Sequence, residues 1–161
     1  MLKKYFLGGF VLLCLWASES LAQTPTPIIP TPNSFAFSAG ARIREFPSGA
    51  AIKQGDLLYI DPADGKAKLA NASGGAAAAN VSCIAAGVAN DGGRVRCATF
   101  DPALTVGQAV VRGELYVVSG VDGRMSTAAS LISGNYVTFV GFGLNATQII
   151  FDPMSYGVAV P

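Results

Sequence analysis

From Phe35 onward, short runs of branched and aromatic residues alternate with turn sequences, and no long stretch shows the 3.6-residue apolar period of an amphipathic helix. The turns contain Pro-Ser-Gly, Asp-Gly, Asn-Asp-Gly-Gly and Ser-Gly-Asn, which all favour tight reversals of the chain. Because these turn sequences follow one another closely, only short strands fit between them. The sequence therefore predicts one all-β domain over residues 35–161, folded as a small barrel or sandwich.

The predicted strands are the runs rich in Val, Ile, Tyr and Phe. They cover residues 35–37, 41–46, 57–60, 81–88, 94–100, 108–112, 114–118, 136–141 and 147–151. Short helical turns are compatible with residues 76–80 and 127–132. Residues 70–80 (ANASGGAAAAN) place two glycines beside an alanine run, and we expect them to form a mobile surface loop.

A weak internal repeat runs through the chain. GDLLYIDPADGK (55–66) is echoed by GELYVVSGVDGR (113–124), and VSCIAAGVAN (81–90) by VTFVGFGLN (137–145). The tripeptide Phe-Asp-Pro at 100–102 recurs at 151–153. Repeated strand-turn-strand units predict two similar β halves, about residues 41–103 and 104–155, packed into one domain.

Three carboxylates, Asp56, Asp61 and Asp64, lie close together in the first copy of the repeat. Three acids at short spacing suggest either a metal or acid/base site or the polar residues of a hairpin. The second copy keeps the Asp-Gly pair and has Glu114 for Asp56, but it has no acid for Asp61. Asp-Gly supplies the positive φ of a tight hairpin, so the hairpin interpretation is favoured, with Asp56 and Glu114 facing solvent.

Asp61 and Asp64 remain a weak calcium candidate, since they lack the alternating ligands and the bidentate Glu of a calcium loop. The chain has no histidine, which excludes Ser-His-Asp and Cys-His catalysis, and two thiols are too few for a typical zinc site. No phosphate-binding loop or dinucleotide fingerprint occurs. We predict no catalytic residue and no cofactor, with a small secreted hydrolase that uses carboxylates as a remote alternative.

The N-terminus has the pattern of a secretory signal peptide. Two lysines follow Met1, residues 6–17 are apolar, and Ser20-Leu-Ala22 places small residues before a cleavage point. The apolar run is shorter than the roughly 20 residues that span a bilayer. The sequence predicts a signal peptide over residues 1–22, cleavage between Ala22 and Gln23, export, and no membrane attachment afterwards. An uncleaved anchor or a buried helix is the alternative.

Residues 23–34 (QTPTPIIPTPNS) contain four prolines and are predicted to form an extended arm or linker. Two interpretations are open: a passive spacer, or an arm that lies on a neighbouring subunit. The second would use the apolar and proline residues of the arm and the first predicted strand. These are Pro25, Pro27, Ile28, Ile29, Pro30, Phe35 and Phe37.

Loss of residues 1–22 would remove two of 11 basic and one of 10 acidic residues and leave a net charge of zero. We therefore expect no nucleic-acid partner. Cys83 and Cys97 would then be the remaining cysteines. An isolated pair in an exported protein predicts a disulfide, and two buried small side chains are the alternative. Counting outward from a turn at 90–93 places the pair about three residues out of register, so a bulge or a different pairing is needed.

Six short motifs, taken in their order along the chain, are similar to those of one known family. The motifs are AIKQGDLLYI (51–60), DGK (64–66), IAAGVAND (84–91), ALTVGQAV (103–110), DGR (122–124) and VGFGLNAT (140–147). In this order, and over about residues 35–155, the chain resembles the capsid cement, or head decoration, proteins of tailed bacteriophages. The resemblance implies a small Gly/Ala-rich β protein that binds the outside of an expanded capsid, often as a trimer, and is not an enzyme.

The resemblance thus implies a non-catalytic structural protein on a virion surface. Its partners would be a capsid shell or its own copies, with a homotrimer as one arrangement. Cement proteins assemble without export, so the predicted signal peptide departs from the family pattern. The alternative is an exported β domain that binds a cell surface, a fibre or a saccharide.

Overall fold

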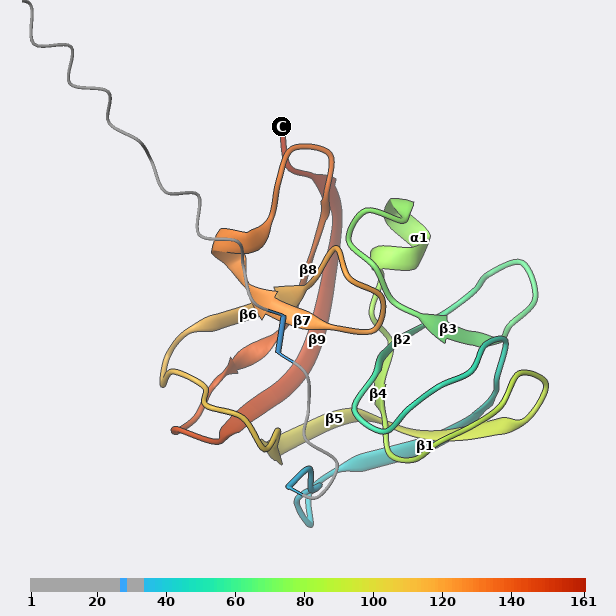
Figure 1. Cartoon of the computed structure of the whole chain (residues 1–161), viewed down its shortest axis with the longest axis horizontal. Helices are drawn as coiled ribbons and strands as arrows, with labels where there is room; N and C mark the ends of the chain where they lie inside the picture. Colours follow the sequence, from blue (N-terminus) through green and yellow to red (C-terminus); the bar gives the residue numbers. More distant parts are fainter. Residues whose placement is uncertain (1–26, 29–33) are drawn as a thin grey trace, which may run out of the picture.

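The computed structural model of the chain describes residues 27–28 and 34–161. The predicted signal peptide, the cleavage point between Ala22 and Gln23, and the arm residues Pro25, Ile29 and Pro30 lie outside these ranges. Within them the chain is nearly all β, as predicted, and its sheet curls into a half-barrel (Figure 1). No helix of this described part is long and apolar enough to cross a membrane.

Nine strands and two short helical segments make up the described part of the fold. In chain order they are β1 (Arg42–Pro47), β2 (Leu57–Ile60), β3 (Ala67–Leu69), α1 (Gly75–Ala79), β4 (Cys83–Ala85), β5 (Arg94–Thr105), β6 (Leu115–Val118), β7 (Met125–Thr127), the 3-10 helix η1 (Ala128–Ser130), β8 (Tyr136–Gly143) and β9 (Gln148–Ala159). The strands form one antiparallel sheet in the order β3-β2-β4-β5-β9-β8-β6-β7, with β1 paired to β5.

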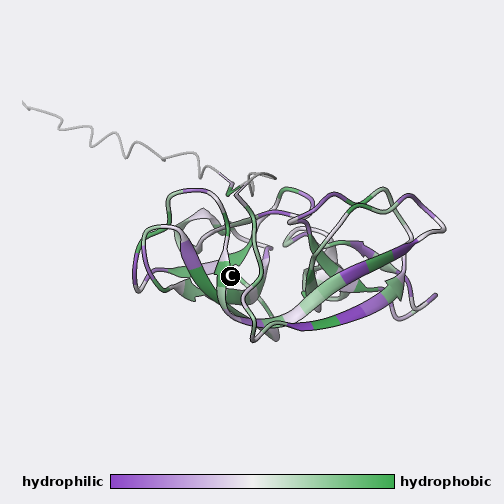
Figure 2. Cartoon of the chain, turned by 90° about the horizontal axis from the view of Figure 1, so that it is seen from below, coloured by the Kyte–Doolittle hydropathy of each residue, from purple (hydrophilic) through white to green (hydrophobic). Residues whose placement is uncertain are grey.

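The sheet order contains the same unit twice, which confirms the two halves predicted from the sequence. In the first half β3 pairs with β2, β2 with β4, and β4 with β5. In the second half β7, β6, β8 and β9 pair in the same way. The halves join where Asp101 of β5 lies opposite Phe151 of β9. Figure 2 shows them as two lobes joined along one side by long strands.

The two Asp-Gly turns occupy matching places in the halves. Gly65 and Gly123 have φ values of 69° and 68°, the left-handed region that glycine adopts without steric cost. Gly65 N donates to Asp61 O at 2.8 Å, and Ser119 N donates to Arg124 O at 2.9 Å. These turns set the β2–β3 and β6–β7 hairpins.

Several predicted strands differ from those of the structure. Residues 108–112 form no strand, the predicted strand 81–88 shrinks to β4, and residues 35–37 make only the bridge from Ala36 to Thr105. β3 and β7 were not predicted; each has three residues, too few for a visible alternation. β9 runs eight residues beyond Phe151, the end of the predicted strand, to Ala159.

The prediction of a mobile loop at residues 70–80 was wrong. Residues 75–79 form α1, and Ala70, Ala72 and Ala79 are almost fully buried. Ala72 N donates to Ser119 O at 2.9 Å, which attaches the segment to the second half. Small alanine side chains let the backbone pack closely against the end of the half-barrel, so the low-complexity run is a packing element.

The main core fills the interior of the half-barrel and is shared by the two halves. Its largest side chains come from both of them: Leu57, Ile84, Leu104, Tyr116, Met125, Ile149 and Phe151. The chain before β1 also contributes, because Phe35 is buried there and Ile28 and Phe37 pack against it. Fully burying such side chains stabilises the fold by about 1.5–3 kcal/mol each.

A second core lies on the opposite, outer face of the first half. It contains Leu58 of β2, the two cysteines of β4 and β5, and Val95. Phe46 at the end of β1 and Ile52 in the loop that follows belong to the same cluster and lie in the segment leading from β1 to β2. This segment therefore covers the outer face of the first half.

The turn of the second hairpin bonds back to the first half. Leu57 N donates to Gly123 O at 2.9 Å, and Gly123 N donates to Ala70 O at 2.8 Å. The amide of Asn71 adds a hydrogen bond of 2.6 Å to the carboxylate of Asp122. These contacts hold the β2–β3 end of the sheet against the β6–β7 end.

Candidate functional site

Part of the outer face of the second half is exposed at a position where the first half is buried. The repeat aligns Leu58 with Leu115, because it aligns Tyr59 with Tyr116. Leu58 has no exposed surface, whereas Leu115 is 47% exposed. β1 and the loop after it cover the first face, and no strand of the described residues covers the second. Equivalent positions thus differ only in what lies over them.

Six apolar side chains form this exposed surface, which we call the apolar sheet face. They are Leu115 of β6, Phe139 and Phe142 of β8, and Ile150, Met154 and Tyr156 of β9. Leu115 lies opposite Phe142, which in turn lies opposite Ile150, so one row crosses three strands. The rings of Phe139 and Tyr156 meet edge to face with centroids 5.5 Å apart.

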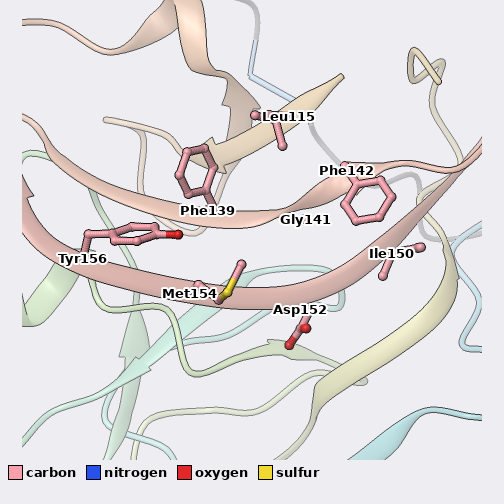
Figure 3. A pocket seen from close by; sticks show the side chains of 8 residues that line it. All are labelled: Leu115, Phe139, Gly141, Phe142, Ile150, Asp152, Met154 and Tyr156. Atoms are coloured by element: carbon pink, nitrogen blue, oxygen red, sulfur yellow. The ribbon is translucent and has the colours of Figure 1, made fainter. Parts of the chain in front are cut away.

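The apolar sheet face is hollowed in its middle. A depression of about 240 Å³ lies between these side chains and Gly141, whose lack of a side chain leaves the floor open (Figure 3). Gly141 is required here because a Cβ would lie 1.9 Å from the carbonyl oxygen of Ile150. At this glycine the backbones of β8 and β9 therefore approach more closely than any side chain would allow.

The face carries almost no charge. Among the described residues that line the hollow, Asp152 is the one carboxylate, and none is a lysine or arginine. Methionine and aromatic residues are enriched at the centres of protein–protein interfaces, and charged residues are depleted there. Phe142, Met154 and Tyr156 are each between 43% and 57% exposed, far more than large apolar side chains in a core. The described side chains around the hollow are therefore mostly aromatic and aliphatic, with one carboxylate, Asp152, and one phenol, Tyr156.

The two Phe-Asp-Pro copies place their carboxylates differently. Asp101 is fully buried and accepts hydrogen bonds from Ser38 N at 3.0 Å and Ala103 N at 2.9 Å. It thereby fixes the chain that leads into β1. Asp152 lies at the exposed rim of the hollow. The repeated motif therefore anchors a covering segment in the first half only.

Asp61 and Asp64, the weak calcium candidate, hold a lysine between them. Lys68 Nζ lies 2.6 Å from Asp61 Oδ2 and 2.9 Å from Asp64 Oδ2. Its hydrogen bonds lower the pKa of both carboxyls, and the carboxylates raise the pKa of Lys68. Elsewhere in the described residues no group of three or more Asp, Glu, Cys or His side chains is placed to hold a metal. An ammonium group occupies the position that a bound cation would need.

The expectation that Asp56 faces solvent was wrong. Its residue is 3% exposed, and its Oδ1 lies 3.0 Å from Arg124 Nη1. Its Oδ2 accepts a hydrogen bond from Lys53 N at 2.8 Å. Oδ1 has no well-directed hydrogen bond within the described part of the chain, so Arg124 acts on it by charge. Burial raises the pKa of Asp56, and the Lys53 amide and the charge of Arg124 oppose that rise.

Cys83 and Cys97 lie at disulfide distance, with sulfurs 2.14 Å apart and Cα atoms 5.7 Å apart. β4 and β5 pair Ala85 with Cys97 and Ile84 with Ala98, so the two cysteines are diagonal neighbours on one face. The observed pairing is shifted by one residue from that of a symmetric turn at 90–93, and the cysteines remain two residues out of register, a separation that a diagonal pair on one face can bridge. Both side chains are fully buried in the second core.

The described residues of the predicted contact arm pack on their own chain. Ile28 N donates to Met125 O of β7 at 2.8 Å, and Ile28, Phe35 and Phe37 contact the main core. Pro27 lies beside a shallow depression near η1. The described arm residues therefore lie against the sheet of their own chain. They do not come together with the calcium candidate, Asp61 and Asp64, or with the two cysteines.

Comparison of the chain with protein-family models, curated proteins and solved structures finds no match in any of the three.

The apolar sheet face was not predicted from the sequence. Its signal is the alternation of Ile150, Met154 and Tyr156 along β9, which looks like an ordinary half-buried strand. Whether such a strand is covered depends on distant segments, and a local pattern does not report them.

Proposed function

We propose that the protein is a non-catalytic structural protein that acts through surface contacts between subunits, in the manner of phage capsid cement proteins. The observation that carries this proposal is the apolar sheet face. A sheet surface of six large apolar side chains with one carboxylate at its rim suits contact with protein. A role in reinforcement needs such contact area and no reactive group.

The fold supports the proposal in a second way. The resemblance implies a small β protein built from strands and turns, and the chain has that architecture in two repeated halves. The pairing of β5 with β9 and the shared main core join the two halves. A protein that reinforces a shell benefits from such a connection, because strain on one half is transmitted to the other.

The test combines genomic context with binding. We expect a major capsid or portal gene beside the gene for this protein. A shell assembled from the neighbouring capsid protein should carry the purified chain into the pellet on ultracentrifugation, saturably. The matched control is the same shell before expansion. Absence of a capsid gene nearby, or a chain that stays in the supernatant, would count against the cement role.

An exported β domain that binds a surface, fibre or saccharide is the second candidate. The close pair Cys83 and Cys97 favours it, since disulfides persist mainly in oxidising compartments. Mass spectrometry of the mature chain from fractionated cells separates the two. A chain that begins at Gln23 in the periplasm or medium supports export, and one that begins at Met1 in the cytoplasm contradicts it.

A further inference from the structure

We propose that a second hollow, beside η1, binds a neutral saccharide unit. It lies where the segment between β3 and α1 meets the second half, and we call it the serine-lined hollow. Its volume is about 310 Å³, within the range of roughly 300–1,000 Å³ that small-ligand sites occupy. Its polar side chains are those of Ser73, Ser119, Ser130 and Asn135. The inference goes beyond the proposed structural role and does not depend on it.

The backbone of one residue brings three of these side chains together. Ala72 N donates to Ser119 O at 2.9 Å, and Tyr136 N donates to Ala72 O at 2.9 Å. Ser73 follows Ala72 in the chain, and Asn135 precedes Tyr136. Ala72 is fully buried, so this junction belongs to the packed interior. Three segments that are distant in the sequence thus meet around the hollow.

Two of the polar side chains are deeply buried and still have donors to offer. Ser119 and Asn135 are each 5% exposed and line the hollow. Asn135 Oδ1 accepts a hydrogen bond from Ile132 N at 3.3 Å, and its Nδ2 has no acceptor among the described residues. Ser119 Oγ accepts one from Val121 N at 3.2 Å, and its proton likewise has no acceptor there. Asp56 Oδ1 is the one fully buried side-chain polar atom of the described part without a partner, so the Asn135 nitrogen is open to solvent.

The hollow also offers acceptors. Ser73 Oγ donates to Asn71 Oδ1 at 2.7 Å, which leaves the lone pairs of the serine oxygen for a ligand. The hydroxyls of Ser126 and Ser130 bond to each other, and that bond leaves further lone pairs unused. A hydroxyl group both donates and accepts. A ligand rich in hydroxyls can therefore use the open donors and acceptors of the hollow at the same time.

The rest of the lining favours a neutral sugar over a charged ligand or a peptide. Within the described residues no charged side chain lines the serine-lined hollow. Val121 and Ile132 flank it, are 51% and 68% exposed, and can contact the C–H surface of a sugar ring. Extended peptides are bound mainly by the main-chain groups of a strand edge. Here the open hydrogen-bonding groups are side chains from separate segments.

Titrations followed by two-dimensional NMR of the full chain test the inference, because the side-chain amide of Asn135 gives its own signals. The probes are glucose, galactose, mannose and N-acetylglucosamine. We expect at least one of them to shift the signals of Asn135, Ser119 and Val121 saturably, with a Kd on the order of 1–10 mM. The shifts should not depend on salt, since no charged side chain lines the hollow among the residues described.

Two variants test the site itself. Asn135→Asp keeps the acceptor for Ile132 N but replaces the donor nitrogen, and it should weaken binding by about tenfold or more. Gly120→Leu adds a side chain to the wall of the hollow, where a Cβ meets no atom within 4 Å, and it should block binding without unfolding the chain. Asn90→Asp is the matched control, because it makes the same change at an exposed position of the first half. Circular dichroism checks that all three variants fold.

The inference is overturned if none of the four sugars shifts these signals up to about 100 mM. It is also overturned if Asn135→Asp and Gly120→Leu bind as the wild type does. A capped tripeptide that shifts the same signals when the sugars do not would identify a peptide site instead. The outcome is separable from that of the proposed function, since a chain that binds sugar and never pellets with the capsid shell supports the inference and refutes the cement role.

Discussion

The carboxylate of Asp56 lies 3.0 Å from the guanidinium of Arg124, and this ion pair joins the two ends of the sheet. Asp56 immediately precedes β2 of the first half, and Arg124 precedes β7 of the second. Beside the pair, Leu57 N and Gly123 O share a hydrogen bond of 2.9 Å. The ion pair and the backbone hydrogen bond thus join the two ends of the half-barrel sheet at the same place.

Arg124→Met should destabilise the protein by about 1–3 kcal/mol, because it leaves the buried Asp56 carboxylate without its counter-charge. The double variant Asp56→Asn/Arg124→Met should recover part of that loss, since the buried charge is then gone as well. Urea unfolding followed by circular dichroism measures both. Equal stabilities of the wild type and Arg124→Met would show that the pair contributes nothing to closure.

The same carboxyl predicts a pH dependence. Burial raises the pKa of Asp56 in the folded state, so the folded chain binds its proton more tightly than the unfolded chain does. The contribution of Asp56 to stability therefore falls as pH rises from the ordinary value of 3.8 through the raised folded value. Asp56→Asn should gain stability relative to the wild type across that window. A constant difference at all pH values would contradict the assignment.

The burial of Asp56 illustrates what the sequence could not reveal. The Asp-Gly turns, the repeat and most strands follow from local chemistry, namely positive-φ glycines and alternating Val, Ile and Tyr. Asp56 looked like a solvent-facing residue because its partner, Arg124, belongs to the other half of the chain. No local pattern reports a contact over that separation.

The candidate site was missed for a related reason. Leu58 and Leu115 occupy matching sequence positions, and nothing in their neighbours tells which is covered. The difference arises from the path of residues 46–52, which return over the first half only. The repeat itself was visible in the sequence, so the comparison of its two copies became informative once the covering segment was located.

Lys68→Met should remove acid sensitivity from the first hairpin. The lysine lowers the pKa of Asp61 and Asp64, so their contribution is present above pH 3.8 and is lost as pH falls through the lowered folded values. The stability difference between the wild type and Lys68→Met should therefore shrink on acidification. Lys66→Met is the control, and it should change the slope much less, because the charge of Lys66 is only a minor cause of the lowered pKa of Asp64.

Calcium should leave the wild type unaffected, because Lys68 Nζ already bridges the two carboxylates. Thermal melting with excess calcium and with a chelator should give the same Tm. A rise in Tm with calcium in the wild type would restore Asp61 and Asp64 as a cation site. Ligand binding stabilises by mass action, so even weak binding is detectable at high calcium.

Removal of the cysteine pair should weaken the protein strongly. Cys83 and Cys97 are 14 residues apart, and closing a loop of that size contributes about 3 kcal/mol through the unfolded state. Cys83→Ala/Cys97→Ala should lower the urea midpoint, and a reductant should do the same to the wild type but not to the double variant. Thiol labelling of the unfolded wild type, with and without reductant, checks that the bond is present.

Gly141→Ala tests whether the close approach of β8 and β9 shapes the apolar sheet face. The added Cβ would lie 1.9 Å from the Ile150 carbonyl oxygen, a distance that the strands can relieve only by separating. We expect a loss of about 3 kcal/mol or more in urea unfolding. Gly120→Ala is the matched control, because no atom lies within 4 Å of the Cβ it would add. A Gly141→Ala chain as stable as the control would mean that β8 and β9 can shift freely, and the hollow would then not be a fixed feature of the surface.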